Sequence, residues 1–353
     1  MKIAILNDQH IGCRGDSKVF IRHQDRFFTE IFFPAIKERK IDTILHLGDI
    51  FDRRKNINFQ TFQESKRFFF EPLKDCGAVM HTILGNHDIY YTNTNSVNSP
   101  ELLLQEYPNI KIYRSEPVEL TFEHLKILMC PWLSENTKEK LDILKSSSAN
   151  ILCGHFGLKG FEMMKGVVSD SGIDHKEFSH FEWVLTGHYH HPSQYGNIKY
   201  LGAQYEMNWS DYGESRGFYI LDTSTRELEY IENPKRIHHK LEYDDTDLTI
   251  DEISALDVSM LEDCFVKVLV KNRSNTYLYD LFLDKLNSAG AADVKTVEDS
   301  LDLGNITDEN VLAEGVKDTK AILHEYVDQT ETDLDKSRIK SVIDELYAEA
   351  LNQ

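Results

Sequence analysis

The sequence has few cysteines, and none of them belongs to a recognisable metal or disulfide motif. The five, Cys13, Cys76, Cys130, Cys153 and Cys264, are scattered over 353 residues without a Cys-x-x-Cys pair. An odd number of unevenly spaced cysteines argues against a disulfide framework and against a thiolate zinc site. We therefore expect reduced thiols and a reducing compartment.

The sequence also lacks any apolar run long enough to cross a bilayer. A transmembrane helix needs about 20 consecutive apolar residues, and an export signal needs a charged segment before its apolar one. Met1 is followed at once by a strand-like pattern. We therefore expect a soluble cytoplasmic protein without a membrane partner. With 41% hydrophobic residues, the chain can bury a sizeable core.

Positive charge is scarce overall, but the deficit lies in one part of the chain. The 39 Lys and Arg residues face 59 Asp and Glu residues, a net charge of −20. Residues 241–353 hold 27 acidic and 10 basic residues, and residues 1–240 hold the remaining 32 and 29. The first part therefore carries only −3, so the acidic total does not exclude a nucleic-acid substrate there.

Five short segments that contain metal-binding residue types stand where apolar, strand-like runs stop. Carboxylates, imidazoles and an amide at one edge of a sheet suit divalent ions, and five segments supply enough ligands for two. One such tripeptide would occur by chance, but five in one chain predict a metal site. The segments are Asp8-Gln9-His10, Gly48-Asp49, Gly85-Asn86-His87-Asp88, Gly154-His155 and Gly187-His188-Tyr189-His190.

The hydrophobic pattern predicts an α/β protein with three parts. Strands alternate with helices, of which 20–37 and 59–73 are the clearest, and the pattern becomes mainly β after Pro108. This mixture predicts two packed sheets with helices outside. We expect a metal-binding domain at 1–235, a small α+β cap at 236–303 and a helical, acidic segment at 304–353.

The ligand types favour a two-ion centre in which one carboxylate is shared. Two cations a few Å apart need a bridging carboxylate to offset their repulsion, and Asp49 is our candidate. Oxygen and nitrogen ligands favour Mn²⁺ or Fe²⁺ over Ca²⁺, with Mg²⁺ as a further alternative. Asp8, His10 and His190 would bind one ion, and Asn86, His155 and His188 the other.

His87 is the candidate catalytic side chain, because it adjoins Asn86 without being needed as a ligand. A protonated imidazole there would stabilise a phosphorane or protonate a leaving oxygen. Asp52 or Asp88 would hold its ring. The assignment of His190 has one alternative, its neighbour His191.

In this order, the five motifs resemble those of the calcineurin-like metallophosphoesterase superfamily. Within it, the chain is similar to the SbcD-type DNA-repair nucleases, the partners of SbcC/Rad-type coiled-coil ATPases. Its size and short acidic tail look most like phage recombination nuclease subunits. Supporting segments are 5–10, 47–52 and 200–204, with Asp211, Glu214 and Gly217 following.

The resemblance implies a four-layer α/β/β/α nuclease sandwich, a capping domain and a C-terminal helical segment that docks on the ATPase. It implies two Mn²⁺ ions, 3′–5′ exonuclease activity on duplex DNA and endonuclease activity on single strands. It also implies a homodimer formed through nuclease-domain helices, for which the Phe-rich segment 59–70 is our candidate. A phage-encoded member would act in the host cytoplasm.

One position departs from the SbcD-type pattern. Some members have histidine three residues after the bridging aspartate, where this chain has Asp52. Asp52-Arg53 instead resembles the Gly-Asp-x-x-Asp-Arg element of protein phosphatases, where the aspartate orients the catalytic histidine. This likeness implies catalytic roles for Asp52 and Arg53.

The substrate is not fixed by these motifs, because one metal core serves several phosphate esters. Basic residues flank the first two motifs and favour a phosphate-rich polymer such as DNA. Two alternatives stay open: a metallophosphatase or nucleotide phosphodiesterase, and a non-catalytic DNA-binding clamp. The candidate DNA contacts are Arg14, Lys18, Arg22, Arg54 and Lys55.

Overall fold

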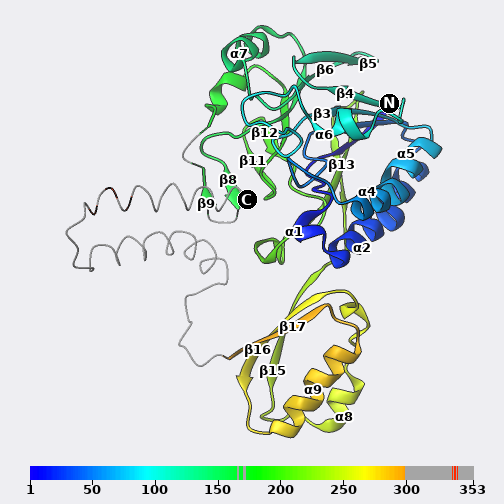
Figure 1. The fold of residues 1–353 in the computed structure, drawn as a ribbon, viewed down its shortest axis with the longest axis vertical. Helices are drawn as coiled ribbons and strands as arrows, with labels where there is room; N and C mark the ends of the chain where they lie inside the picture. The colour runs from blue at the N-terminus through cyan, green and yellow to red at the C-terminus, as the bar shows by residue number, and fades with distance from the viewer. Residues whose placement is uncertain (165–166, 170–171, 299–335, 337, 339, 341–353) are drawn as a thin grey trace. The chain divides into compact units, whose positions relative to one another are not determined.

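The computed structural model describes residues 1–164, 167–169, 172–298, 336, 338 and 340. Its largest elements are two six-stranded sheets (Figure 1). In spatial order, the first contains β14 (Leu228–Glu232), β13 (Gly217–Asp222), β1 (Lys2–Leu6), β2 (Thr43–His46), β3 (Val79–Ile83) and β4 (Ile110–Tyr113). The second contains β11 (Ser193–Tyr195), β12 (Ile198–Tyr200), β10 (Trp183–Gly187), β7 (Ile151–His155), β6 (Leu125–Cys130) and β5 (Val118–Phe122).

Alternation along β1 shows how the sheets are layered. Ile3 and Ile5 point to a core shared with Ile151 and Leu185 of the second sheet. Ala4 and Leu6 face the opposite side, which helices cover. Since the second sheet has its own outer core with helical residues, the predicted α/β/β/α sandwich is confirmed.

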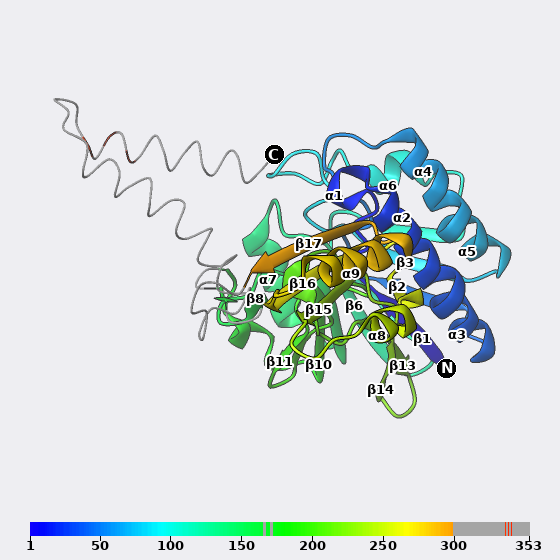
Figure 2. The same cartoon turned by 90° about the horizontal axis from the view of Figure 1, so that it is seen from below.

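Helices cover the outer faces of both sheets. Those on the first sheet are α2 (Lys18–Phe27), α3 (Phe33–Glu38), α4 (Phe59–Ser65) and α5 (Glu71–Asp75), which lie side by side in Figure 2. The second sheet packs against α7 (Thr137–Ser146) and the 3₁₀ turn His175–Phe178. Shorter elements are α1 (Cys13–Asp16), α6 (Ser99–Leu103), the 3₁₀ turn Trp209–Asp211 and the pair β8 (Glu162–Met164) and β9 (Val167–Val168).

The Phe-rich segment 59–70, our candidate dimer surface, exposes only part of its phenylalanine side chains. Phe68, Phe69 and Phe70 are fully buried, whereas Phe59 is 88% exposed. The three belong to a π-helical turn, Lys66–Phe70, which meets a second π-helical turn, Phe28–Phe32. Phe28 and Phe69 have ring centroids 4.6 Å apart. Core packing therefore accounts for the phenylalanines of this turn.

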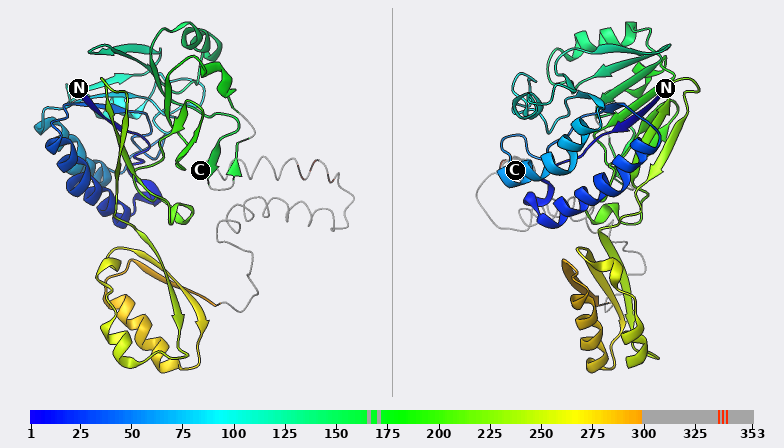
Figure 3. Two further views of the ribbon diagram at one scale, coloured as in Figure 1. Left: turned by 180° about the vertical axis from the view of Figure 1, so that it is seen from behind. Right: turned by 90° about the vertical axis from the view of Figure 1, so that its right-hand side faces the viewer.

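Residues 238–298 form a separate small sheet with helices on one face (Figure 3). The parallel strands are β15 (His238–Asp244), β16 (Phe265–Asn272) and β17 (Asp293–Glu298). They pack on α8 (Ile250–Ala255), α9 (Thr276–Ser288) and the 3₁₀ turn Ser259–Leu261 through a core of their own. These strands and helices lie within residues 236–303, the range of the predicted α+β cap.

The predicted helices of segment 304–353 lie outside the described residues, apart from three isolated positions. Within the part of the chain that the structure describes, no helix is long and apolar enough to cross a membrane.

Candidate metal centre

The five predicted segments meet at one edge shared by the two sheets. Strands β1, β2 and β3 run parallel, as do β7 and β10, so their carboxyl ends point the same way. The seven predicted ligands follow or end these strands. The structure brings together three groups of candidate ligands, and within each group the ligand atoms lie within 4.8 Å of one another. The groups are Asp8, His10 and His190; His10, Asp49 and His87; and Asp8, Asp49 and His155.

Asp49 is central to this cluster. One carboxylate oxygen lies 3.5 Å from His10 Nε2 and 3.3 Å from His155 Nε2. The other accepts the backbone N–H of His87 at 2.8 Å. One carboxylate thus faces imidazoles delivered by both sheets, as a bridging ligand must.

The other ligand candidates form a set on each side of Asp49. On one side, His10 Nε2 and His190 Nε2 are 3.0 Å apart, with Asp8 Oδ1 3.9 Å from His10. On the other, the side-chain oxygen of Asn86 lies 3.0 Å from His155 Nε2 and 2.8 Å from His188 Nδ1. These two sets match the two predicted triads.

The neighbouring histidine, His191, turns away from this cluster. Its ring nitrogens lie 2.6 Å from Glu214 and 3.0 Å from Glu162. The geometry therefore favours His190 over His191 as the ligand candidate.

The backbone that carries these side chains is strained. Asp8, His10, Asp49 and His188 all have positive φ, at 44°, 44°, 58° and 91°. Such conformations cost about 1–3 kcal/mol each for a residue with a Cβ and concentrate at functional sites. The strain lets each loop turn sharply at its strand end and direct its side chain into the cluster.

Two glycines allow the loops after β2 and β3 to touch through their backbones. A Cβ on Gly48 would lie 2.6 Å from Gly85 N, and one on Gly85 would lie 2.6 Å from Asp49 N. Gly48 also has φ +89°. Any side chain at either position would separate Asp49 from Asn86.

Further hydrogen bonds and close contacts orient the imidazoles. His155 Nδ1 donates to the Leu47 carbonyl at 2.7 Å, so Nε2 is the nitrogen that faces Asp49 and Asn86. His10 Nδ1 lies 3.2 Å from the Asp52 carboxylate. A ligand histidine whose second nitrogen faces a carbonyl or carboxylate is the usual arrangement around protein-bound metals.

Burial and charge shift the pKa values in this cluster strongly. Burial lowers the pKa of His10, but the carboxylates of Asp52, Asp49 and Asp8 outweigh it and raise it to about 9. Burial likewise opposes protonation of His155, yet Asp49 and Asp8 raise its pKa to about 9. The buried carboxylates thus attract positive charge, which divalent cations would supply.

The expected partners of the His87 ring differ from those found. His87 Nδ1 donates to the backbone carbonyl of Asp52 at 2.5 Å, while the Asp52 carboxylate faces His10. The Asp88 carboxylate instead accepts the N–H groups of Asp49, Gly85 and Ile50 at 2.8–3.0 Å. Asp88 therefore joins the β2 and β3 loops, and burial raises its pKa to about 7.

The predicted basic residues are dispersed. Arg54 is nearest the cluster, with Nε donating to the Asn86 carbonyl at 2.7 Å. Arg22 Nε donates to Asp263 at 2.8 Å, and Arg14 Nε to the Met207 carbonyl at 2.8 Å. Lys18 and Lys55 are exposed. Arg53, predicted to be catalytic, is 44% exposed and lies 3.2 Å from Asp16.

Three residues at the site were missed from the sequence. Asn7 donates to Asp8 at 2.6 Å, and the Trp132 ring centroid lies 5.1 Å from that of His188. Arg216, 1% exposed, donates to the His190 carbonyl and pairs with Asp211 at 2.8 Å. Asn7 follows the end of β1 and Trp132 follows the end of β6, so a position after a strand was the signal available for these two residues.

Comparison with known proteins agrees with this geometry. Residues 1–203 match the family described as calcineurin-like phosphoesterase. The chain is 30% identical to Exonuclease subunit 1 of Enterobacteria phage T4, over 99% of each protein. It is 25% identical to an SbcCD nuclease subunit of Staphylococcus epidermidis, over 65% of this chain and 67% of that protein. The matched range 1–203 contains all five strand-end segments.

Proposed function

This chain belongs to the calcineurin-like phosphoesterase family, as its motifs predicted, and we propose that it is a two-metal DNA nuclease. The observation that carries the proposal is the position of Asp49 between two ligand sets. Asp8, His10 and His190 would hold one ion, Asn86, His155 and His188 the other, and Asp49 would bridge them. Mn²⁺ is the ion we propose, with Mg²⁺ or Fe²⁺ as substitutes.

The bound ions would neutralise charge on the scissile phosphate and lower the pKa of an attacking water. The chain's own residues position that chemistry. Asp52 holds the ring of His10, and the Leu47 carbonyl holds that of His155, so that each Nε2 faces Asp49 and a proposed ion. Asp88 fixes the two loops that carry Asp49 and Asn86.

We assign His87 the role of general acid. Its Nδ1 is occupied by the Asp52 carbonyl, so Nε2 is the atom that would give a proton to the leaving oxygen. Its ring centroid lies 4.7 Å from that of His10, a proximity that supports its proposed role next to the scissile phosphate. Arg53 faces Asp16, and we propose a substrate-binding role for it.

The relatives support DNA as the substrate. Proteins named as an exonuclease subunit and as an SbcCD nuclease subunit match this chain, and the word subunit in both names supports assembly with another chain. We propose 3′–5′ exonuclease activity on duplex DNA and endonuclease activity on single strands, in DNA repair or recombination. We further propose a coiled-coil ATPase partner, bound through segment 304–353, and a homodimer acting in the cytoplasm.

The test is Mn²⁺-dependent cleavage of end-labelled linear duplex and single-stranded DNA. We expect chelation of the metal, Asp49→Ala and His87→Ala each to abolish or strongly reduce cleavage. The matched control is His124→Ala, because His124 lies in an exposed turn. Undiminished cleavage by both site variants would refute the site assignment. Turnover of cyclic nucleotides or phosphopeptides without DNA cleavage would favour a phosphatase instead.

A further inference from the structure

A cavity of about 150 Å³ lies beside the metal centre, between the loops after β2 and β3. Its wall residues continue the two metal-binding motifs. Phe51 stands two residues after Asp49, and Tyr90 stands three residues after His87. Arg54, another wall residue, donates to the Asn86 carbonyl at 2.7 Å. The cavity wall is therefore formed in part by the same loops that carry Asp49 and Asn86.

The cavity combines an apolar interior with a cationic rim. Phe51 is 2% exposed, and Leu103 packs in the same core. Tyr90 forms a partly exposed aromatic wall. The rim carries three consecutive cations, Arg53, Arg54 and Lys55.

The Tyr90 wall is held in place. The Tyr90 N–H donates to the Val97 carbonyl at 2.9 Å. Its ring packs edge-on against Tyr91, with centroids 4.7 Å apart. A fixed aromatic face is suited to stacking on a flat ring at a small entropic cost. Of the rim cations, Lys55 has no ion-pair partner among the described residues, so its ammonium is available to a phosphate.

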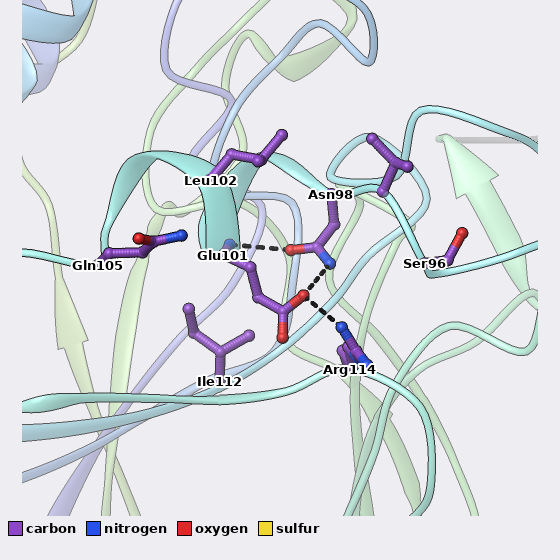
Figure 4. A pocket seen from close by; sticks show the side chains of 8 residues that line it. Ser96, Asn98, Glu101, Leu102, Gln105, Ile112 and Arg114 are labelled. Atoms are coloured by element: carbon purple, nitrogen blue, oxygen red, sulfur yellow. Dashed lines mark hydrogen bonds and ion pairs between the residues drawn. The ribbon is translucent and has the colours of Figure 1, made fainter.

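A second hollow, which shares Val97, Asn98 and Leu102 with the first, differs in chemistry. There Glu101 accepts hydrogen bonds from Asn98 at 2.8 Å and from Arg114 at 3.0 Å (Figure 4). Its charged groups thus satisfy one another. The cavity next to Tyr90 instead offers an apolar interior beside cations, the combination that binds a nucleobase and its phosphates.

We propose that the Tyr90 cavity takes one unpaired nucleobase from the nucleotide next to the scissile phosphate. The inference rests on the proposed nuclease function and deepens it. Pockets for drug-sized ligands measure about 300–1,000 Å³, so this smaller cavity suits a single base. A base in the cavity cannot stay paired. The substrate strand is therefore single or frayed at the point of cleavage.

The test compares 5′-labelled single-stranded oligonucleotides that have either a base or an abasic sugar next to one internal phosphodiester, and it measures cleavage at that bond. We expect wild-type kcat/KM to be about tenfold higher with the base, a ratio within the range of base–aromatic stacking. Tyr90→Ala should remove this preference, and Tyr90→Phe should keep it. The matched control is Tyr277→Ala, an exposed tyrosine of α9 outside the cavity wall, which should also keep it.

A second variant covers the case in which Tyr90→Ala fails to fold. Val97→Trp, at a partly exposed wall position, should fill the cavity and lower the rate on the base-containing strand to the abasic rate. Equal wild-type rates on both strands would overturn the inference while leaving the nuclease proposal intact. A preference for the base-containing strand that persists in both Tyr90→Ala and Val97→Trp would also overturn the inference. Cleavage of neither strand, together with no cleavage of linear duplex DNA, would overturn the nuclease proposal, and the inference with it.

Discussion

At the scale of single residues, Asp52 shows how a side chain outside the proposed ligand set can control it. Its carboxylate lies 3.2 Å from His10 Nδ1. That contact fixes which ring nitrogen of His10 faces Asp8 and Asp49, and it strengthens the imidazole as a donor to a cation.

We therefore predict that Asp52→Asn weakens Mn²⁺ binding by about 10- to 100-fold, the usual effect of losing such a contact. Isothermal titration with Mn²⁺ measures the change. Asp142→Asn, an exposed substitution on α7, is the control and should bind Mn²⁺ as the wild type does. Unchanged Mn²⁺ affinity in Asp52→Asn would mean that the carboxylate does not support His10.

His87 and Asp49 should separate catalysis from binding. We predict that His87→Ala lowers kcat by about 10²–10⁴-fold, the typical contribution of a general acid, while the protein still binds Mn²⁺. Asp49→Ala should lose Mn²⁺ binding as well, because the shared carboxylate offsets the repulsion between the ions. Mn²⁺ titrations and rate measurements on both variants distinguish a loss of catalysis from a loss of metal binding. Loss of Mn²⁺ binding in His87→Ala would make His87 a ligand rather than the acid.

The sequence predicted the cluster of candidate ligands but not the residues that support this cluster. Asp8, Asp49 and His155 were identifiable because a parallel strand must deliver whatever follows it to one edge of the sheet. The contact between Asp52 and His10 was not identifiable, since it depends on how the positive-φ loops at His10 and Asp49 turn. Side-chain partners across loops far apart in the sequence have no local signal.

At the scale of elements, the loops after β2 and β3 are in direct backbone contact. We predict that Gly48→Ala destabilises the protein more than Gly77→Ala, although both glycines have positive φ. A Cβ at Gly77 meets nothing within 4 Å, so only the left-handed backbone costs free energy there, about 1–2 kcal/mol. At Gly48 the Cβ also collides with Gly85.

Urea unfolding of the two variants checks this prediction, and Mn²⁺ titration adds a second measurement. Gly48→Ala should also bind Mn²⁺ weakly, because the collision moves Asp49 away from Asn86. Gly77→Ala, at the exposed end of α5, should bind normally. Equal free energies of unfolding in both variants would contradict a tight contact between the loops.

Packing between elements also explains why Phe68, Phe69 and Phe70 are buried and not on the surface. In an α-helix, three consecutive side chains point in directions about 100° apart, so one of them is expected to face solvent. Phe68, Phe69 and Phe70 occupy a wider π-helical turn, between the sheet and the facing turn Phe28–Phe32. All three directions are therefore covered by protein. Only the tertiary neighbours, which the sequence pattern does not specify, reveal this.

At the scale of the whole molecule, charge and metal ligands occupy different parts of the chain. Residues 1–298 form one compact unit that contains every proposed ligand. Most of the net negative charge lies after residue 240. The proposed phosphate-binding surface is thus separated along the chain from the acidic segment, which would repel DNA.

We predict that truncation after Asn305 leaves Mn²⁺-dependent DNA cleavage within about twofold of the full chain but abolishes binding to a coiled-coil ATPase partner. The compact unit ends at Glu298, and cuts beyond a compact unit are the best tolerated. The removed part carries a stripe of apolar residues, Ile339, Val342, Ile343, Leu346 and Leu351, of the kind that fits a groove on another protein. Co-purification with the ATPase and cleavage assays on the same preparations test both halves. If the truncated protein still binds the ATPase, the docking surface lies within residues 1–305. If it binds Mn²⁺ but no longer cleaves DNA, the acidic segment takes part in the reaction.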